Sequence, residues 1–165
     1  SQGTLQAIYE FQTMVCELFQ MDLANASLYD GSSSVAEAVL LSLHATERPR
    51  ILVSEALHPH ARQTIATYLV GAEAILQELP TVNGVTDLEA LGKALREDVA
   101  CVVLQQPNVF GCLEPMTQAG ELAHRAGALF VASVYPISLG LLQPPGAYGA
   151  DIAGAEGRCL GTPMA

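Results

Sequence analysis

Residues 27–38 read Ser-Leu-Tyr-Asp-Gly-Ser-Ser-Ser-Val-Ala-Glu-Ala, and this stretch decides how the rest of the chain is interpreted. A short apolar run over 21–26 precedes it, and small and branched apolar residues follow. We therefore predict a strand over 21–26 that passes through a Gly-Ser turn into a buried helix over 34–45. The amino end of a helix carries free N–H groups and the positive end of its dipole, so Ser32, Ser33 and Ser34 can bind a phosphate or a carboxylate there.

The same three serines also suit helix capping. Serine is a common N-cap residue, and Ser34 and Glu37 have the spacing of a capping box. The stretch is not a Walker-type phosphate loop, which would require a lysine after its glycines. The local pattern therefore leaves two interpretations open, a capped helix and an anion site.

Composition limits the classes of partner. The chain has 165 residues, enough for one domain with a substantial core, and half of them are hydrophobic. Its formal charge is −10, with only seven Lys and Arg residues, which disfavours nucleic acid as a partner. It contains neither the roughly 20 consecutive apolar residues of a membrane span nor the order of a signal peptide. We predict a cytoplasmic protein that binds neither nucleic acid nor membrane.

The cysteine and histidine pattern predicts no metal site. Cys16, Cys101, Cys112 and Cys159 are scattered without a C-x-x-C pair, so neither a zinc site nor a disulfide framework is indicated. The sequence His58-Pro59-His60 has no carboxylate or cysteine at a supporting spacing.

Helical and strand-like segments alternate along the whole chain. Residues 4–19 have apolar side chains at helical spacing and predict a packing helix with one buried face. Pro59 can begin a helix that continues over 61–69, and Asp87 can cap a helix over 88–96. Residues 80–86, which include Asn83-Gly84, are expected to form a loop. Strands are expected at 50–54, 74–79, 99–104, 128–132 and 151–153, and a further helix is expected at 116–126.

This order predicts a three-layer α/β/α domain around a mostly parallel sheet. A ligand in such a sheet lies beyond the carboxyl ends of the strands. Residues 27–34, 54–58, 105–108, 133–138 and 155–158 are expected to meet at that edge. The chain begins directly in a helix and stops over 160–165, where another strand is expected, so we interpret 1–165 as a single domain excised from a longer chain.

Four motifs in order resemble the glycine cleavage system P-protein family. They are Gly3-Thr4-Leu5-Gln6, Phe11-Gln12-Thr13-Met14, the Ala-Asn-Ala-Ser-Leu-Tyr-Asp-Gly run over 24–31, and the Pro-Pro-Gly segment over 144–152. The chain looks most like subunit 1 of the two-subunit bacterial form, or the N-terminal half of the long form. The resemblance implies the large domain of the fold-type-I pyridoxal-phosphate enzymes, an aspartate aminotransferase-like fold. It also implies a reaction in which glycine loses carbon dioxide and its aminomethyl group passes to the lipoyl arm of the H-protein.

Such a site needs a lysine that holds pyridoxal phosphate and a carboxylate at the pyridine nitrogen. The only lysine is Lys93, on the predicted helix 88–96. By resemblance, Arg158 or a neighbour stands at the lysine position, and arginine stays protonated and cannot bind the cofactor covalently. Tyr135 stands where the pyridine-nitrogen aspartate is expected. The resemblance thus implies a pseudo-catalytic subunit, with the cofactor on sister subunit 2.

No catalytic residue is therefore assigned to this chain. Tyr29, Ser32, Ser33, Ser34 and His58 are the candidates for a vestigial cofactor edge or for a wall of the sister subunit's active site. The implied partners are sister P-protein subunit 2, the lipoylated H-protein and glycine. The alternatives are a purely structural association module and an autonomous pyridoxal-phosphate enzyme, such as an aminotransferase or a cysteine desulfurase, for which a suitably placed lysine is missing.

Overall fold

The computed structural model describes residues 1–161 and shows a five-stranded parallel sheet in the order β2-β1-β5-β6-β7. The strands are β1 Arg50–Ser54, β2 Ile75–Leu79, β5 Val99–Gln106, β6 Leu129–Val134 and β7 Ile152–Ala155. A separate antiparallel hairpin joins β3 Thr81–Val82 and β4 Val85–Thr86. The five strands expected at 50–54, 74–79, 99–104, 128–132 and 151–153 are thus confirmed.

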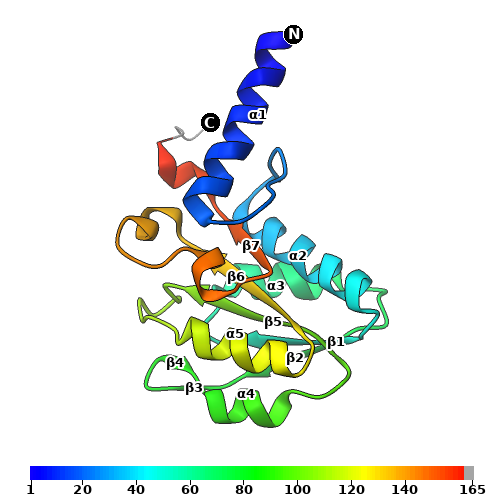
Figure 1. The fold of residues 1–165 in the computed structure, drawn as a ribbon. Coiled ribbons are helices and arrows are strands. Elements are labelled where there is room, and N and C mark those ends of the chain that lie inside the picture. Colours follow the sequence, from blue (N-terminus) through cyan, green and yellow to red (C-terminus); the bar gives the residue numbers. More distant parts are fainter. Residues whose placement is uncertain (162–165) are drawn as a thin grey trace.

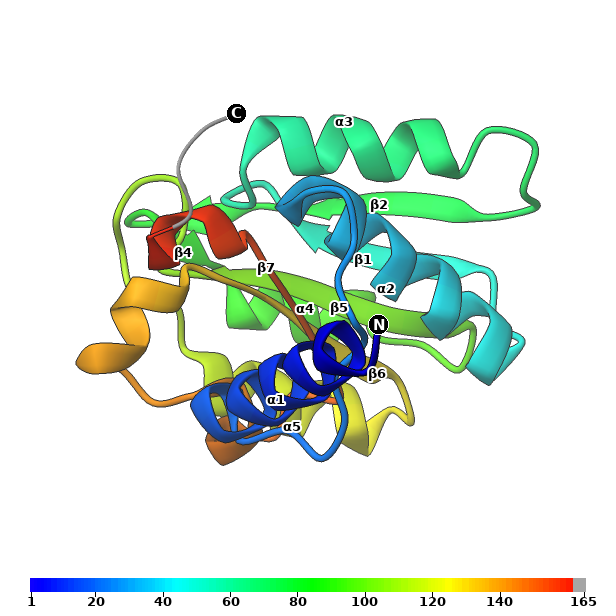
Figure 2. The same cartoon turned by 90° about the horizontal axis from the view of Figure 1, so that it is seen from above.

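Helices cover both faces of the sheet (Figures 1 and 2). On one face lie α2 and α3, and on the other lie α4, α5 and the end of α1, which confirms the three-layer α/β prediction. The helices are α1 Gln2–Phe19, α2 Gly31–Thr46, α3 Pro59–Tyr68, α4 Leu88–Ala94 and α5 Met116–Arg125. Short 3-10 turns, η1 Pro136–Gly140, η2 Pro145–Tyr148 and η3 Gly157–Leu160, fill the Pro- and Gly-rich segment and the end of the described chain.

Strand β5 is the centre of the core. Its residues from Val99 to Leu104 are fully buried because helices cover both of their faces. Cys101 and Val103 pack toward α2 and α3, whereas Val102 and Leu104 pack toward α4 and α5. This burial on both faces explains the continuous apolar run that predicted a central parallel strand.

Two local predictions were wrong. Residues 21–30 form an extended connection instead of a strand, because the sheet ends at β7 and this segment pairs with no strand of the described chain. Residues 80–86 form the β3–β4 hairpin instead of an irregular loop. Asn83 and Gly84 both have positive φ (54° and 80°), the conformation that a two-residue hairpin turn requires.

The N-terminal helix differs from its prediction in packing. Phe19 is the only buried residue of α1, with Val15 packed beside it at the same end. Residues 1–11 are exposed, and Figure 1 shows this half of α1 projecting away from the sheet. The expectation of one buried apolar face is therefore wrong for the first half of the helix.

A close backbone contact anchors the other end of α1. Gln20, its C-cap, has positive φ (52°), and its carbonyl oxygen lies against Gly146 in η2. A β-carbon at position 146 would stand 1.7 Å from that oxygen, so only glycine permits this contact. Residues 162–165, part of the segment where a further strand was expected, lie outside the described residues.

Candidate functional site

The carboxyl ends of the parallel strands meet at one edge, and α2 begins there beside β7 (Figure 1). Gly154 in β7 permits this approach, since a β-carbon at that position would lie 2.7 Å from the Ser34 hydroxyl oxygen. The strand edge therefore brings the end of β7 against the first turn of α2. Any site at the α2 amino terminus is shaped by residues from both elements.

Two carboxylates already occupy the amino terminus of α2. Asp30 is the N-cap, and its Oδ1 accepts a hydrogen bond from the Ser33 N–H at 2.6 Å. Glu156, which follows β7, accepts from the Gly31 N–H through Oε2 at 3.1 Å. The capping-box prediction for Ser34 and Glu37 is wrong, because the Ser34 hydroxyl donates to the Gly31 carbonyl at 2.8 Å and Asp30 caps the helix.

Arg158 completes this group, and we refer to Asp30, Glu156 and Arg158 as the carboxylate cluster. Its guanidinium donates to both Glu156 oxygens, at 3.1 and 3.3 Å. The hydrogen bond from the Ser33 N–H lowers the pKa of Asp30. Hydrogen bonds from Arg158 and from the Gly31 N–H lower the pKa of Glu156. Both carboxyls are therefore ionised at neutral pH and meet the positive end of the helix dipole.

The cluster predicts an acid-sensitive contribution to stability. Asp30→Ala is expected to lower the free energy of unfolding at pH 7 by about 1 kcal/mol, as is usual for a lost N-cap. Because the folded-state pKa of Asp30 is lowered, its contribution is present above the ordinary carboxyl range near pH 4 and is lost as the pH falls through the folded-state value. Urea unfolding from pH 7 to pH 2.5 measures both effects.

Asp30→Asn is the matched control for this prediction, because asparagine is a comparable N-cap but does not ionise. It is expected to keep most of the stability at pH 7 and to lose less than the wild type below pH 4. Equal pH profiles for Asp30→Asn and the wild type would contradict a role for the ionised carboxylate.

The structure brings only some of the predicted site residues together. Ser32, Ser33 and Ser34 form the first turn of α2, and Tyr29 just before it is 96% exposed. His58 lies at the amino end of α3, where its Nδ1 accepts from the His60 N–H at 3.2 Å and its own N–H donates to Gln105. These contacts give His58 a structural role as the N-cap of α3.

A hollow of about 370 Å³ lies between the start of α2 and the length of α3, from His60 to Tyr68. Asp30 and Ser32 line it from α2, and His60, Gln63 and Thr64 line it from α3. His60, which the sequence offered only as half of a possible metal pair, is thus the histidine that shares this hollow with Ser32. His60 and Thr64 are four residues apart and therefore lie on one face of the helix that begins at Pro59. This spacing is the sequence signal that could have predicted His60 as a lining residue.

Sequence reasoning also missed a buried acid at the same strand edge. Glu114 is 5% exposed, and its two oxygens accept from the Thr86 N–H and from the Asn108 amide, each at 2.8 Å. Its own N–H donates to Gln106 Oε1 at 2.8 Å. Glu114 therefore joins the β3–β4 hairpin to the loop after β5, which is a structural role.

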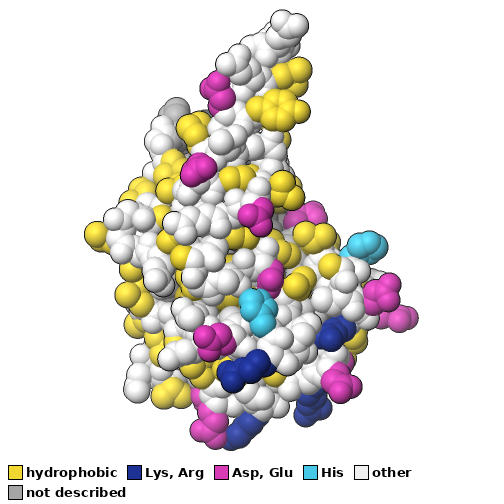
Figure 3. Space-filling view, viewed as in Figure 1, with side chains coloured by type: hydrophobic (Ala, Val, Ile, Leu, Met, Phe, Trp, Pro, Cys, Tyr) yellow, Lys and Arg dark blue, Asp and Glu magenta, His cyan; other side chains and the backbone are white. Residues whose placement is uncertain are grey.

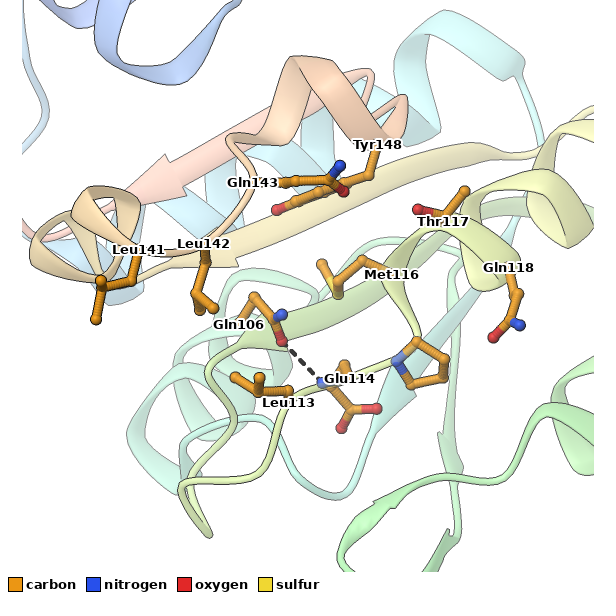
Figure 4. A pocket seen from close by; sticks show the side chains of 11 residues that line it. Gln106, Leu113, Glu114, Met116, Thr117, Gln118, Leu141, Leu142, Gln143 and Tyr148 are labelled. Carbon is orange, nitrogen blue, oxygen red and sulfur yellow. Dashed lines mark hydrogen bonds between the residues drawn. The ribbon is translucent and has the colours of Figure 1, made fainter.

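A larger, mostly apolar hollow of about 580 Å³ lies beside α5 (Figure 4). In this view Tyr148 lies above Gln106 and Met116, and Leu141 and Leu142 line the hollow on the left. The Tyr148 hydroxyl is buried and has no hydrogen-bond partner among the described residues, and burial raises its pKa. None of the five predicted site residues lines this hollow.

The central strand carries a buried thiol, and the described residues hold no metal centre. Burial raises the pKa of the Cys101 thiol to about 12, so it stays protonated in the core. Within residues 1–161, no three His, Cys, Asp or Glu side chains gather as metal ligands. In the same residues, no helix is long and apolar enough to cross a membrane.

The residues present do not fit the cofactor that the resemblance implies. Lys93 is exposed in the last turn of α4, paired with Glu89 at 2.5 Å, and therefore lies toward the amino end of β5, which starts at Val99. At the opposite edge, where the cofactor phosphate would meet α2, the Gly31 and Ser33 N–H groups already donate to Glu156 and Asp30. Within the described residues, a covalently bound pyridoxal phosphate has no lysine at this edge, and two of the amide donors there are already paired.

Comparison with known proteins places these features in a family. The sequence profile of the glycine cleavage system P-protein family matches residues 1–165. A protein of Desulfitobacterium hafniense named probable glycine dehydrogenase (decarboxylating) subunit 1 is 52% identical over 99% of this chain, and its counterpart in Moorella thermoacetica is 53% identical. The chain spans 37% of the length of each of these relatives.

Solved structures give the same result for the fold. A crystal structure of glycine decarboxylase (P-protein) of the glycine cleavage system, in an inhibitor-bound form, superposes with a TM-score of 0.94 at 50% identity. It is matched over 99% of this chain and 37% of its own. The cysteine desulfurase of Thermococcus onnurineus, at 19% identity and a TM-score of 0.72, shares the fold alone.

Proposed function

Because the chain belongs to the glycine cleavage system P-protein family, we propose that it is the part of glycine decarboxylase that lacks the cofactor lysine and completes the active site of a sister subunit. In this proposal the assembled enzyme converts glycine and lipoylated H-protein to aminomethyl-lipoyl H-protein and carbon dioxide in the cytoplasm. Pyridoxal phosphate is held by sister subunit 2.

The carboxylate cluster is the observation that carries this proposal. Glu156 and Asp30 accept from two of the amide donors at the start of α2, the Gly31 and Ser33 N–H groups, which a cofactor phosphate would need. When N–H groups at the amino terminus of a helix already donate to carboxylates of the same chain, fewer donors remain for a second anion. With the single lysine at the other edge of the sheet, the chain supplies a protein surface to the reaction instead of a covalent anchor.

The role that we propose for this surface follows from the side chains at the carboxyl edge of the sheet. When held by the sister subunit, pyridoxal phosphate would supply an electron sink for the decarboxylation of glycine. Tyr29, Ser32, Ser33, Ser34 and His58 are the residues that we propose for the wall facing that site. Tyr29 is exposed, and the serine hydroxyls stand beside the helix terminus, so they can position a substrate and exclude water.

Separate purification of the two full-length subunits tests the assignment. Subunit 1 alone is expected to show no cofactor absorbance and no label after borohydride reduction. Glycine decarboxylation is expected only when subunit 2 and lipoylated H-protein are added. Cofactor trapped on subunit 1 alone would refute the proposal.

Two variants in the assembled enzyme then distinguish two possible roles of this chain. It either forms a wall of the active site or is a purely structural association module. Ser33→Ala and His58→Asn are expected to lower kcat/KM about tenfold with unchanged assembly, and asparagine preserves an N-cap acceptor for α3. His44→Asn, exposed in the last turn of α2, is the matched control. Wild-type kinetics for both edge variants would leave association as the only function of this chain.

A further inference from the structure

The mostly apolar hollow beside α5 has the size and the lining of a small-molecule site, and we call it the α5 hollow. Its volume of about 580 Å³ lies within the range of roughly 300–1,000 Å³ that is usual for ligand pockets. Such pockets combine apolar walls with a few polar groups that fix the orientation of the ligand. Leu113, Met116 and Leu142 supply apolar walls here, and Tyr148 supplies a polar group.

Tyr148 carries a hydrogen-bond donor that the described fold leaves unused. The residue is 6% exposed, and its hydroxyl has no partner among residues 1–161. A buried hydroxyl without a partner costs free energy, so nearly all such groups in folded proteins are hydrogen-bonded. Burial raises the pKa of Tyr148, so the hydroxyl stays protonated at neutral pH. It therefore offers a proton to an acceptor.

The close-up view shows how an acceptor can reach this hydroxyl. In Figure 4 the Tyr148 ring runs along the upper side of the α5 hollow, with its hydroxyl end toward the side that holds Leu142. The side chain of Gln143 lies beside the ring in this view and is exposed. Because Gln143 is exposed, it can turn outward and admit the oxygen of a ligand to the hydroxyl.

The amino terminus of α5 adds donors to the same hollow. Its N-cap, Pro115, makes no side-chain capping bond, and the first turn contains no acidic residue. The Met116 N–H donates to the Glu114 carbonyl at 2.8 Å, but the Thr117 and Gln118 N–H groups donate to no acceptor within residues 1–161. Thr117 and Gln118 both line the hollow. These free N–H groups and the positive end of the helix dipole attract an acceptor oxygen.

The charges around the α5 hollow favour a neutral ligand over an anion. Among the described residues that line it, none is Lys, Arg or His, whereas Glu114 is one of them. The Glu114 carboxylate is held by the Thr86 N–H and the Asn108 amide, and the chain as a whole carries a charge of −10. An anion would meet this negative charge without a cation to pair with. A carbonyl oxygen accepts the same hydrogen bonds without bringing a net charge.

We propose that the α5 hollow binds a small neutral molecule that has an apolar body and a carbonyl oxygen, such as an amide, an ester or a ketone. The carbonyl oxygen accepts from the Tyr148 hydroxyl and lies at the amino terminus of α5. The apolar body packs against Leu113, Met116 and Leu142. This inference does not depend on the function proposed above, because none of the residues proposed for the wall lines this hollow.

A matched pair of probes tests the class of ligand on the full-length chain. Hexanamide carries a neutral carbonyl group, and hexanoate carries a carboxylate on the same apolar body. Ligand-observed NMR titration is expected to give a dissociation constant on the order of 1 mM or below for hexanamide. Hexanoate is expected to bind at least about fivefold more weakly at low salt, because the negative charge of Glu114 and of the whole chain is then poorly screened.

Tyr148→Phe in the full-length chain tests the hydroxyl, because it removes one oxygen and keeps the ring. The affinity for hexanamide is expected to fall about fivefold, as is usual for one lost hydrogen bond. The melting temperature should equal or exceed that of the wild type, because the lost oxygen has no partner in the fold. Tyr9→Phe on the exposed part of α1 is the matched control and should change neither quantity. Leu142→Trp fills the hollow and should abolish binding of the probe.

Four results would overturn the proposal. The first is equal affinity of the wild type and Tyr148→Phe for hexanamide. The second is a melting temperature of Tyr148→Phe several degrees below that of the wild type, which would show that the hydroxyl already has a protein partner. The third is tighter binding of hexanoate than of hexanamide. The fourth is no binding of hexanamide to the full-length chain, which is the result expected if the rest of the polypeptide fills the hollow.

Discussion

Replacement of Gly146 by alanine is expected to lower the free energy of unfolding by about 3 kcal/mol or more. The new β-carbon would stand 1.7 Å from the Gln20 carbonyl oxygen and 2.6 Å from its carbonyl carbon, both backbone atoms that no side-chain rotation can move. The junction between α1 and η2 must therefore open. For a domain of this size the melting temperature should fall by about 6–12 °C, which differential scanning calorimetry measures.

Gly92→Ala is the control for the same chemical change. No atom lies within 4 Å of a β-carbon at position 92, which is inside α4 and has no positive φ. Alanine is a better helix former than glycine, so this variant should be slightly more stable than the wild type. Equal stability of the Gly146→Ala and Gly92→Ala variants would show that the α1–η2 contact is looser than the structure indicates.

Glu114→Ala is expected to cost about 3 kcal/mol. The substitution leaves the buried Thr86 N–H without an acceptor and removes one of two acceptors of the Asn108 amide. Each lost hydrogen bond destabilises the fold, and the unpaired buried donor at Thr86 adds a desolvation penalty of its own. Urea unfolding followed by circular dichroism gives the difference.

Two variants accompany this measurement. Glu114→Gln keeps one carbonyl oxygen but turns an N–H₂ group toward a donor, so it should fall between the wild type and Glu114→Ala. Glu121→Ala on the exposed surface of α5 should change the stability by less than about 0.5 kcal/mol. A Glu114→Ala variant as stable as Glu121→Ala would contradict the structural role of the buried acid.

The parts of the fold that depend on local pattern were predictable. The run over 99–104 predicted β5 because a strand buried on both faces needs apolar residues without alternation. Pro59 and Asp87 predicted the starts of α3 and α4 because each acts on backbone groups within three residues. The strand predicted over 21–26 failed because a strand also needs a neighbour, which no local pattern supplies.

The site was predictable only in its location. The sequence placed residues 27–34 and 155–158 at one strand edge, and the structure confirms that α2 begins beside the end of β7. It did not predict that Glu156 would bind the Gly31 N–H, because the two residues are 125 positions apart. Nor did it predict the bare face of α1, since periodicity shows which residues are apolar but not what covers them.

The carboxylate cluster affects the stability of the domain before any ligand binds. A protein whose helix end binds an external anion gains stability from that ligand as RT ln(1 + c/Kd), where c is the ligand concentration, and therefore only when the ligand is present at or above its dissociation constant. Here the anion is part of the polypeptide, so this domain is satisfied as soon as β7 meets α2. The first turn of α2 therefore keeps its two carboxylate partners whatever the concentration of any external anion.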